Sequence, residues 1–450
     1  ADRFNTPGHF TALIGFEWTN TVDGKNLHRV VVLRDDAGRA TKVIPFSSWD
    51  SPDPEDLWDW MDAYERDTGG RMLSIPHNAN VSNGLMFGPA RHDGRPFDAD
   101  YVKRRQQREP LLEVTQVKGD GEAHPWLSPA DEFADFGTWD RADIGGREPK
   151  TKDMLQYEYA RSALKLGLSW EAELGANPFR YGMIGSSDSH TGLSTVREDN
   201  YFSKFSHTEP RPGRGEGMIV ESPTSPDLSW RTWDELASGL AAVWATDNTR
   251  EAIFDAMERR EVYATTGSRI TVRFFGGWGF AEADLVSPDM PRRGYAGGVP
   301  MGGSLGQARA AAPVFMVAAS RDPDGANLDR LQVIKGWLDA AGELHEKVYD
   351  VALSGGRGPD AGGRVPPVGS TVDIEKATYS NTIGAAELRA LWRDPDFDPS
   401  QRAFYYVRAL EIPKPSWQSY DAVRFGDSFP EGVARVVQDR AYTSPIWFDP

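Results

Sequence analysis

The sequence lacks cysteine and lacks any long run of apolar residues. With no cysteine among 450 residues, disulfides, thiolate metal sites and a cysteine nucleophile are excluded, while the compartment stays open. No window approaches the roughly 20 apolar residues of a membrane span, and the first residues do not resemble a signal sequence. Basic residues are the minority, at 50 against 67 acidic ones, which gives a net charge of −17. Because such a surface repels phosphate backbones and anionic bilayers, we expect no nucleic-acid partner and no membrane partner.

What the chain does have is a large apolar content and, in its first part, alternating strand and helix patterns. We predict strands and helices in a first domain of residues 1–265, with strands at 11–18, 29–34, 71–75, 111–117 and 180–186 and helices at 154–168, 250–260 and from Pro54 to a stop at Gly69-Gly70. The last helix has Asp53 as its N-cap and Pro54 at its first position. Alternating strands and helices predict an α/β fold built around a parallel sheet or barrel.

The second part of the chain is expected to be β-rich. Apolar strand patterns separated by Gly, Pro and Asp clusters occupy residues 269–275, 312–320, 329–338, 345–351 and 402–412. Short strands divided by turn residues are typical of an antiparallel sandwich. We therefore predict a β-sandwich-like domain at residues 266–450, packed on the first domain.

Imidazole and carboxylate side chains follow several of the predicted strands. They are Glu17, His77, Glu113, Asp188 and His190. In a parallel barrel the reactive groups come from the carboxyl ends of the strands, where the loops converge on one pocket. Imidazole and carboxylate together form a ligand set for zinc, manganese or iron. We therefore expect a divalent metal site there.

Each of these residues also has a simpler interpretation. Asp188 and His190 fit a surface turn in which the aspartate caps backbone amides. His77 fits a buried histidine bonded to a carbonyl, and Glu17 fits a buried acid paired with Arg29. Their joint occurrence at strand ends favours the metal site.

An anionic substrate bound at such a metal site would need cationic groups to hold it and proton donors for catalysis. Lys118 and Arg29 are the predicted substrate contacts, and Lys118 is also expected to stabilise charge during catalysis. His124 is predicted to orient a ligand or protonate the leaving group, and Asp188 or a neighbouring histidine to accept a proton. The alternatives are a solvated loop lysine at 118 and a loop histidine bonded to Asp120 at 124.

Several segments together resemble a known family. The segments are residues 13–33, 75–87, 111–125, 182–193, 262–270 and 325–339. They are similar to an uncharacterised bacterial domain-of-unknown-function family within the polymerase-and-histidinol-phosphatase superfamily of metal-dependent phosphoesterases. The resemblance implies a distorted (β/α)7 barrel, incomplete at its N-terminus here, whose face holds two or three zinc, manganese or iron ions. It also implies a periplasmic or secreted protein.

The resemblance further implies roles for single residues. Glu17 would be the bridging carboxylate, and His28, His77, Asp188 and His190 would be ligands, with Glu113 near the metals. The family pattern opens with an HxH pair, which this sequence does not contain. We expect a preceding segment with that pair in the full protein. The alternative is a protein that has lost half of its metal site.

The function expected from these observations is metal-dependent hydrolysis of a phosphomonoester or phosphodiester by an activated water. No GxSxG nucleophile motif is present and cysteine is absent, which disfavours a covalent route. The expected partner is a small anionic ester, and a homo-oligomer stays open. The alternatives are cleavage of a sulfate ester, phosphonate ester or amide, and a non-catalytic glycan-binding protein with a degenerate site.

Overall fold

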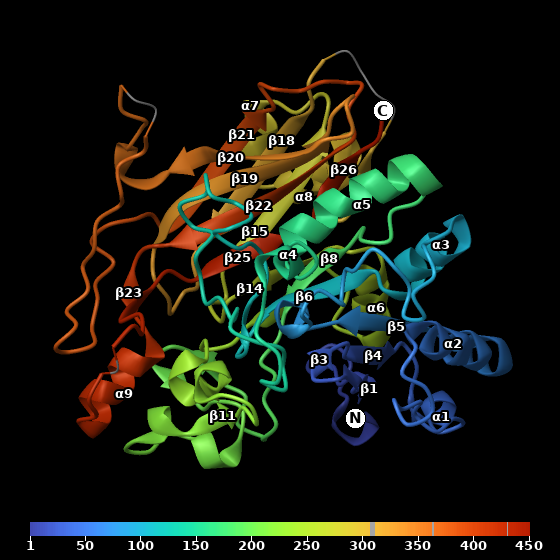
Figure 1. The fold of residues 1–450 in the computed structure, drawn as a ribbon. Helices are drawn as coiled ribbons and strands as arrows, with labels where there is room; N and C mark the ends of the chain where they lie inside the picture. The colour runs from blue at the N-terminus through green and yellow to red at the C-terminus, as the bar shows by residue number, and fades with distance from the viewer. Residues whose placement is uncertain (307–310, 362–363, 430) are drawn as a thin grey trace.

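Strands outweigh helices in this protein. The computed structural model, drawn in Figure 1, describes residues 1–306, 311–361, 364–429 and 431–450. With short 3-10 helices counted beside the α-helices, 22% of the residues are helical and 28% lie in strands. The helices are α1 (Ala37–Ala40), α2 (Pro54–Thr68), α3 (Ala99–Arg108), α4 (Lys152–Leu155), α5 (Ala160–Leu174), α6 (Arg250–Glu258), α7 (Glu282–Leu285), α8 (Met290–Gly297) and α9 (Trp417–Phe425). Within the described part of the chain, no helix combines the length and apolar character needed to cross a bilayer.

The first sheet is antiparallel. It contains β1 (Ile14–Trp18), β4 (Arg29–Leu33) and β5 (Met72–Pro76) in the order β1-β4-β5. The link from β1 to β4 holds only the small hairpin of β2 (Thr21–Val22) and β3 (Lys25–Asn26). A parallel return needs a crossover of roughly a dozen residues or more, usually a helix. The short link therefore brings β4 back antiparallel to β1.

The expected α/β fold with a distorted (β/α)7 barrel is wrong. In the described ranges no sheet closes into a barrel, and the parallel pairs are β6 (Leu111–Gln116) with β8 (Gly182–Gly185) and β17 (Ser304–Leu305) with β26 (Ile446–Phe448). A βα barrel requires every neighbouring pair of strands to be parallel. Instead β6 lies between β8 and the short β7 (Gly119–Asp120), which it pairs with antiparallel.

Two further sheets face each other in the C-terminal half. One has eight strands in the order β13-β14-β25-β22-β19-β20, with β17 and β26 attached, and the other has the order β16-β15-β18-β21. Apolar side chains from both, such as Phe274, Phe315, Val333 and Tyr405, form one buried cluster. Because β13 and β14 precede residue 266, the larger sheet draws on both predicted domains, whose division at 265 stays a prediction.

The two sheets contain β13 (Leu240–Val243), β14 (Val262–Thr265), β15 (Thr271–Gly277), β16 (Gly298–Pro300), β18 (Val314–Ser320), β19 (Leu328–Leu338), β20 (Leu344–Leu353), β21 (Glu387–Arg393), β22 (Ala403–Glu411) and β25 (Arg440–Thr443). Small two-stranded ribbons contain β9 (Val196–Arg197), β10 (Asn200–Tyr201), β11 (Met218–Val220), β12 (Trp230–Arg231), β23 (Lys414–Pro415) and β24 (Val436–Val437).

Helix boundaries follow local signals where those signals are strong. The Asp53 side chain accepts from Glu55 N–H, and Gly69 ends α2 in the left-handed conformation at φ 67°, as the sequence predicts. The helix predicted at 154–168 is instead split into α4 and α5. The first amides of α5 donate to loop carbonyls, Ala160 N–H to Gly121 O at 2.7 Å and Arg161 N–H to Glu122 O at 3.0 Å. This tertiary contact sets the start of α5.

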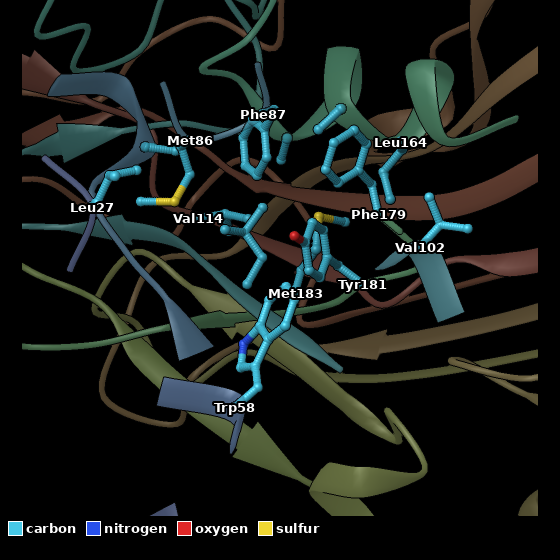
Figure 2. Packing of buried hydrophobic residues seen from close by; sticks show 14 of the residues in the cluster. Leu27, Trp58, Met86, Phe87, Val102, Val114, Leu164, Phe179, Tyr181 and Met183 are labelled. Carbon is cyan, nitrogen blue, oxygen red and sulfur yellow. The ribbon is translucent and has the colours of Figure 1, made fainter. Parts of the chain in front are cut away.

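A second apolar core lies between α2, α3, α5 and the N-terminal strands, and it also includes side chains of the eight-stranded sheet such as Ile334 and Phe404. Figure 2 shows Trp58, Phe87, Phe179, Tyr181 and Met183 converging there, and all of them are almost fully buried. Burying such large side chains is worth about 1.5–3 kcal/mol each before entropy is counted. This core holds the strand ends that carry the candidate site.

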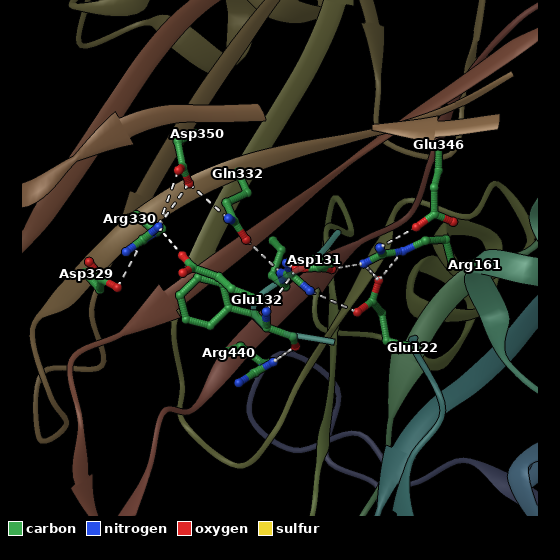
Figure 3. A network of polar contacts seen from close by, with 12 residues as sticks. Glu122, Asp131, Glu132, Arg161, Asp329, Arg330, Gln332, Glu346, Asp350 and Arg440 are labelled. Carbon is green, nitrogen blue, oxygen red and sulfur yellow. Dashed lines mark hydrogen bonds and ion pairs between the residues drawn. The ribbon is translucent and has the colours of Figure 1, made fainter. Parts of the chain in front are cut away.

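A buried ionic network joins α5 to the eight-stranded sheet (Figure 3). Arg161 on α5 contacts Glu122 at 2.6 Å and Asp131 at 2.8 Å. Arg408 on β22 contacts Asp131 at 2.6 Å and Glu122 at 3.3 Å. The four side chains are nearly inaccessible to solvent. Glu346 on β20, whose side chain is 17% exposed, also contacts Arg161 at 3.1 Å. The fully buried part of the network thus pairs two guanidinium groups with two carboxylates.

Replacing Arg161 with Met should destabilise the protein by roughly 3–5 kcal/mol, because two buried carboxylates lose a cation. The measurement is urea unfolding followed by tryptophan fluorescence. The control is Lys347→Met, which removes an ion pair to Asp396 whose side chains are 50% and 47% exposed. That loss should stay within about 1 kcal/mol. Equal unfolding curves for the two variants would contradict the role given to the network.

Candidate metal centre

Glu17, His28 and His77 meet at one edge of the first sheet. The Glu17 Oε1 atom lies 3.0 Å from His28 Nδ1 and 3.0 Å from His77 Nε2. The two imidazole rings stand edge to face, with centroids 5.5 Å apart. The Glu17 side chain is 36% exposed, whereas the two histidine side chains are 11% and 6% exposed. The cluster is therefore open to solvent on its carboxylate side.

The antiparallel register brings these three side chains together. Glu17 lies near the end of β1, His28 directly before β4 and His77 directly after β5. In an antiparallel sheet the end of one strand lies beside the beginning of the next, and His77 N–H donates to His28 O at 3.4 Å. One edge of the sheet thus gathers groups from three distant parts of the chain.

Protonation in the cluster suits ligation. Burial raises the pKa of Glu17, but hydrogen bonds and charges from His28 and His77 outweigh burial and hold that pKa well below its usual range. Burial and the charge of His77 lower the pKa of His28, and the hydrogen bond to Glu17 raises it, but the lowering effects are larger. Glu17 is therefore an anion at neutral pH and His28 is a neutral imidazole, the forms that bind metals.

Amide side chains fix the loops around the cluster. Asn26 donates to His77 O at 2.6 Å and to Asn78 O at 2.8 Å, and its own oxygen accepts from His28 N–H. Gln116 donates to Asn78 Oδ1 at 2.8 Å. Asn78 itself is left-handed, with φ 51°, a conformation that asparagine tolerates better than most residues. These contacts tie the loops after β3, β5 and β6 into one rigid unit.

Glu113 on β6 lies between this cluster and a second polar group. Ser186 Oγ donates to Glu113 Oε2, and Glu113 Oε1 has no hydrogen-bond partner among the described residues. Burial raises the pKa of Glu113, while His77 and Lys118 act to lower it and Asp188 to raise it. The charges of His77 in the first group and of Asp188 and Lys118 in the second thus act on the same carboxyl.

The second group is built on Asp188, which follows β8. Lys118 and Lys204 both donate to Asp188 Oδ2. His190 Nε2 lies 3.3 Å from Asp188 Oδ1 and 3.0 Å from Lys204 Nζ. Burial acts to raise the pKa of Asp188, but Lys118, His190 and Lys204 hold it well below its usual range. Of the two amines, burial and Lys118 lower the pKa of Lys204 to about 8.

Two predicted substrate or catalytic residues lie elsewhere. Arg29 is buried and donates to Glu109 Oε1 at 2.9 Å and to Leu27 O at 2.6 Å, so it pairs with neither Glu17 nor solvent. His124 contacts Asp140 at 3.2 Å, rather than Asp120, and accepts from Trp126 N–H at 3.0 Å. These contacts belong to structural ion pairs and turns, so we assign neither residue to the centre.

Sequence reasoning missed Lys204 and the amide side chains. Lys204 follows Ser203, which has φ 65°, in a segment with no motif or strand pattern. Asn26 and Gln116 likewise carry no spacing signal. Of these features, only the left-handed conformation of Asn78 has a signal in the sequence. Asparagine adopts that conformation more readily than most residues, and Asn78 follows a predicted strand and the predicted ligand His77.

Glu17, His28 and His77 fit a divalent cation. Their ligand atoms all lie within 4.8 Å of one another, and nitrogen with carboxylate oxygen suits zinc, manganese or iron. In the described part of the chain, the buried His77 Nδ1 also lacks a hydrogen-bond partner. Asp188 and His190 do not fit a second cation in the same way, because both contact lysine ammonium groups that repel a metal.

Comparison with known proteins gives one match. The family described as "Protein of unknown function (DUF3604)" matches residues 1–450. The chain belongs to this family. Searches of curated proteins and of solved structures found no match. The predicted membership of a domain-of-unknown-function family is thereby confirmed.

Asp120 on β7, beside the loop that carries Lys118, offers a test by pH. Asp120 Oδ2 has no hydrogen-bond partner in the described ranges, and burial, with the nearby Glu122 carboxylate, raises the pKa of Asp120 from 3.8 to about 7. The unfolded chain releases this proton from about pH 4 upward, whereas the native state keeps it. Native stability should therefore fall as pH rises from about 4 to about 7.

Asp120→Asn should remove this part of the pH dependence. We expect the urea midpoint of the variant to exceed that of the wild type by an amount that grows as the pH rises from 4 to 7. A constant difference across that range would show that Asp120 does not titrate in this way.

Proposed function

We propose that this protein is a metal-dependent hydrolase that cleaves phosphoester bonds. The observation that carries the proposal is a carboxylate and two imidazoles, Glu17, His28 and His77, within ligand distance of one another. The buried Lys118 is near enough to that cluster for its charge to act on His28, and the buried Lys204 shares Asp188 Oδ2 with Lys118. Cation ligands beside anion-binding amines form the combination that hydrolysis of an anionic ester needs.

The roles follow from the contacts. Glu17, His28 and His77 would hold the cation, with Glu113 next to them. When bound, a zinc, manganese or iron ion supplies a Lewis acid that makes water a nucleophile near neutral pH. Asn26 keeps the loops of His28 and His77 at a fixed separation through its hydrogen bonds.

The second group would receive the substrate and manage a proton. Lys118 and Lys204 would bind the anionic oxygens of the ester and stabilise the charge that develops on them. Asp188, whose pKa is held low, is a weak base and positions the lysines. His190 has a side chain 49% exposed and is the better-placed proton acceptor of the pair.

We also propose that the family is related to the polymerase-and-histidinol-phosphatase superfamily. Support comes from the order of the segments that hold Glu17, His77, Glu113 and Asp188. The relation concerns these site segments and not a barrel. A periplasmic or secreted location is part of the same proposal.

The test is hydrolysis of p-nitrophenyl esters by the full chain, stripped with a chelator and reloaded with Zn²⁺, Mn²⁺ or Fe²⁺. We expect release of p-nitrophenol from the phosphomonoester or phosphodiester only after reloading. Glu17→Gln should lower kcat/KM by roughly 100-fold or more, since even residues that only orient metal ligands cost about 10–100-fold. Lys347→Met serves as the control and should match the wild type.

Other outcomes assign other functions. Cleavage of p-nitrophenyl sulfate, a phosphonate ester or an anilide, without cleavage of phosphate esters, would replace the proposed substrate class. Binding of glycans by a protein that holds no metal and shows no turnover would replace the enzyme with a binding protein.

A further inference from the structure

Two lysine side chains share one carboxylate beside the candidate metal centre. The ammonium groups of Lys118 and Lys204 both contact Asp188 Oδ2, and the two side chains are only 6% and 9% exposed. Lys204 Nζ also lies 3.0 Å from His190 Nε2. Both potential metal ligands of this group therefore already contact a cation supplied by the chain.

The charges around Asp188 do not balance. Two ammonium groups face a single carboxylate, and burial keeps the neighbouring Glu113 pKa above its usual value, which weakens its contribution as an anion. At Asp188 itself two ammonium groups thus face one carboxylate, in a chain whose net charge is −17.

We propose that the ammonium groups of Lys118 and Lys204 take the place of a second metal ion at Asp188 and His190. The chain then binds one divalent cation, on Glu17, His28 and His77, and the two lysines bind a tetrahedral oxyanion such as the phosphate of an ester. The inference rests on the proposed function for its single metal and deepens it by naming the group that holds the substrate anion.

Three physical points support this assignment. A dication beside two ammonium groups is repelled strongly in a site from which water is largely excluded. Ammonium groups are compact donors that bind phosphate as point charges. The His190 side chain, whose Nε2 atom lies 3.0 Å from Lys204 Nζ, is 49% exposed, so one side of the group faces solvent.

The first experiment counts metal ions in the full chain. Protein loaded with excess Mn²⁺ and desalted should contain close to one ion per chain by elemental analysis. Its electron paramagnetic resonance spectrum should be that of isolated Mn²⁺, without exchange coupling between ions. His77→Ala should lose the ion, whereas Asp188→Asn should keep it. Two ions per chain, coupled in the spectrum, would overturn the inference without requiring any variant to fold.

The second experiment measures binding of inorganic phosphate to protein loaded with one equivalent of Mn²⁺. Lys204→Met should weaken phosphate binding by about tenfold in calorimetry, since a charge-assisted contact is lost, and should leave the metal content unchanged. Lys347→Met, on the surface of β20, is the matched control. Unchanged phosphate affinity in Lys204→Met, with normal metal content, would refute the anion site.

These results are separable from the test of the proposed function. One metal per chain and lysine-dependent phosphate binding, without turnover of any phosphoester, would support the inference and reject the hydrolase. Phosphoester turnover by a chain with two coupled metal ions would support the hydrolase and reject the inference.

Discussion

The register between β1, β4 and β5 is the constraint on which the candidate centre depends. Trp18 and Arg29 are directly opposed, as are Arg29 and Pro76. Side chains alternate between the faces of a sheet, so Arg29 shares the face of Trp18 and turns away from Glu17. There its guanidinium lies 5.8 Å from the Trp18 ring and pairs with Glu109. A slip of β4 by one residue would exchange the faces, so that Arg29 replaces His28 on the face of Glu17 and His77.

Charge is distributed unevenly in this acidic protein. Most of its surface repels anions, yet Lys118 and Lys204 are buried together beside a single carboxylate. In the network of Arg161 and Arg408 with Glu122 and Asp131, by contrast, the buried charges are matched. A fully matched network stabilises an interface, whereas an unmatched one attracts a ligand of opposite charge.

The predicted barrel is wrong, although many of the predicted strands and helices are present in the structure. The strand patterns at 29–34, 71–75 and 111–117 correspond to β4, β5 and β6, and the helix beginning at Pro54 is α2. Alternation of strands and helices, however, does not record strand direction. Although α2 lies between β4 and β5 in the sequence, β5 pairs antiparallel with β4. Glu17 and His77 still lie together, as predicted. Glu17 lies near the end of β1, His77 follows β5, and both strands point toward the same edge of the sheet.

The sequence by itself determined the residue types at strand ends, the cap and stop of α2, and the absence of thiol chemistry, because these depend on neighbouring residues alone. Only the tertiary structure decided that Arg29 pairs with Glu109, that His124 pairs with Asp140 and that Lys204 contacts Asp188. Each of these pairings joins residues whose meeting depends on strand direction, register or loop path. Such long-range geometry is fixed by packing of the whole chain, and no short stretch of sequence encodes it.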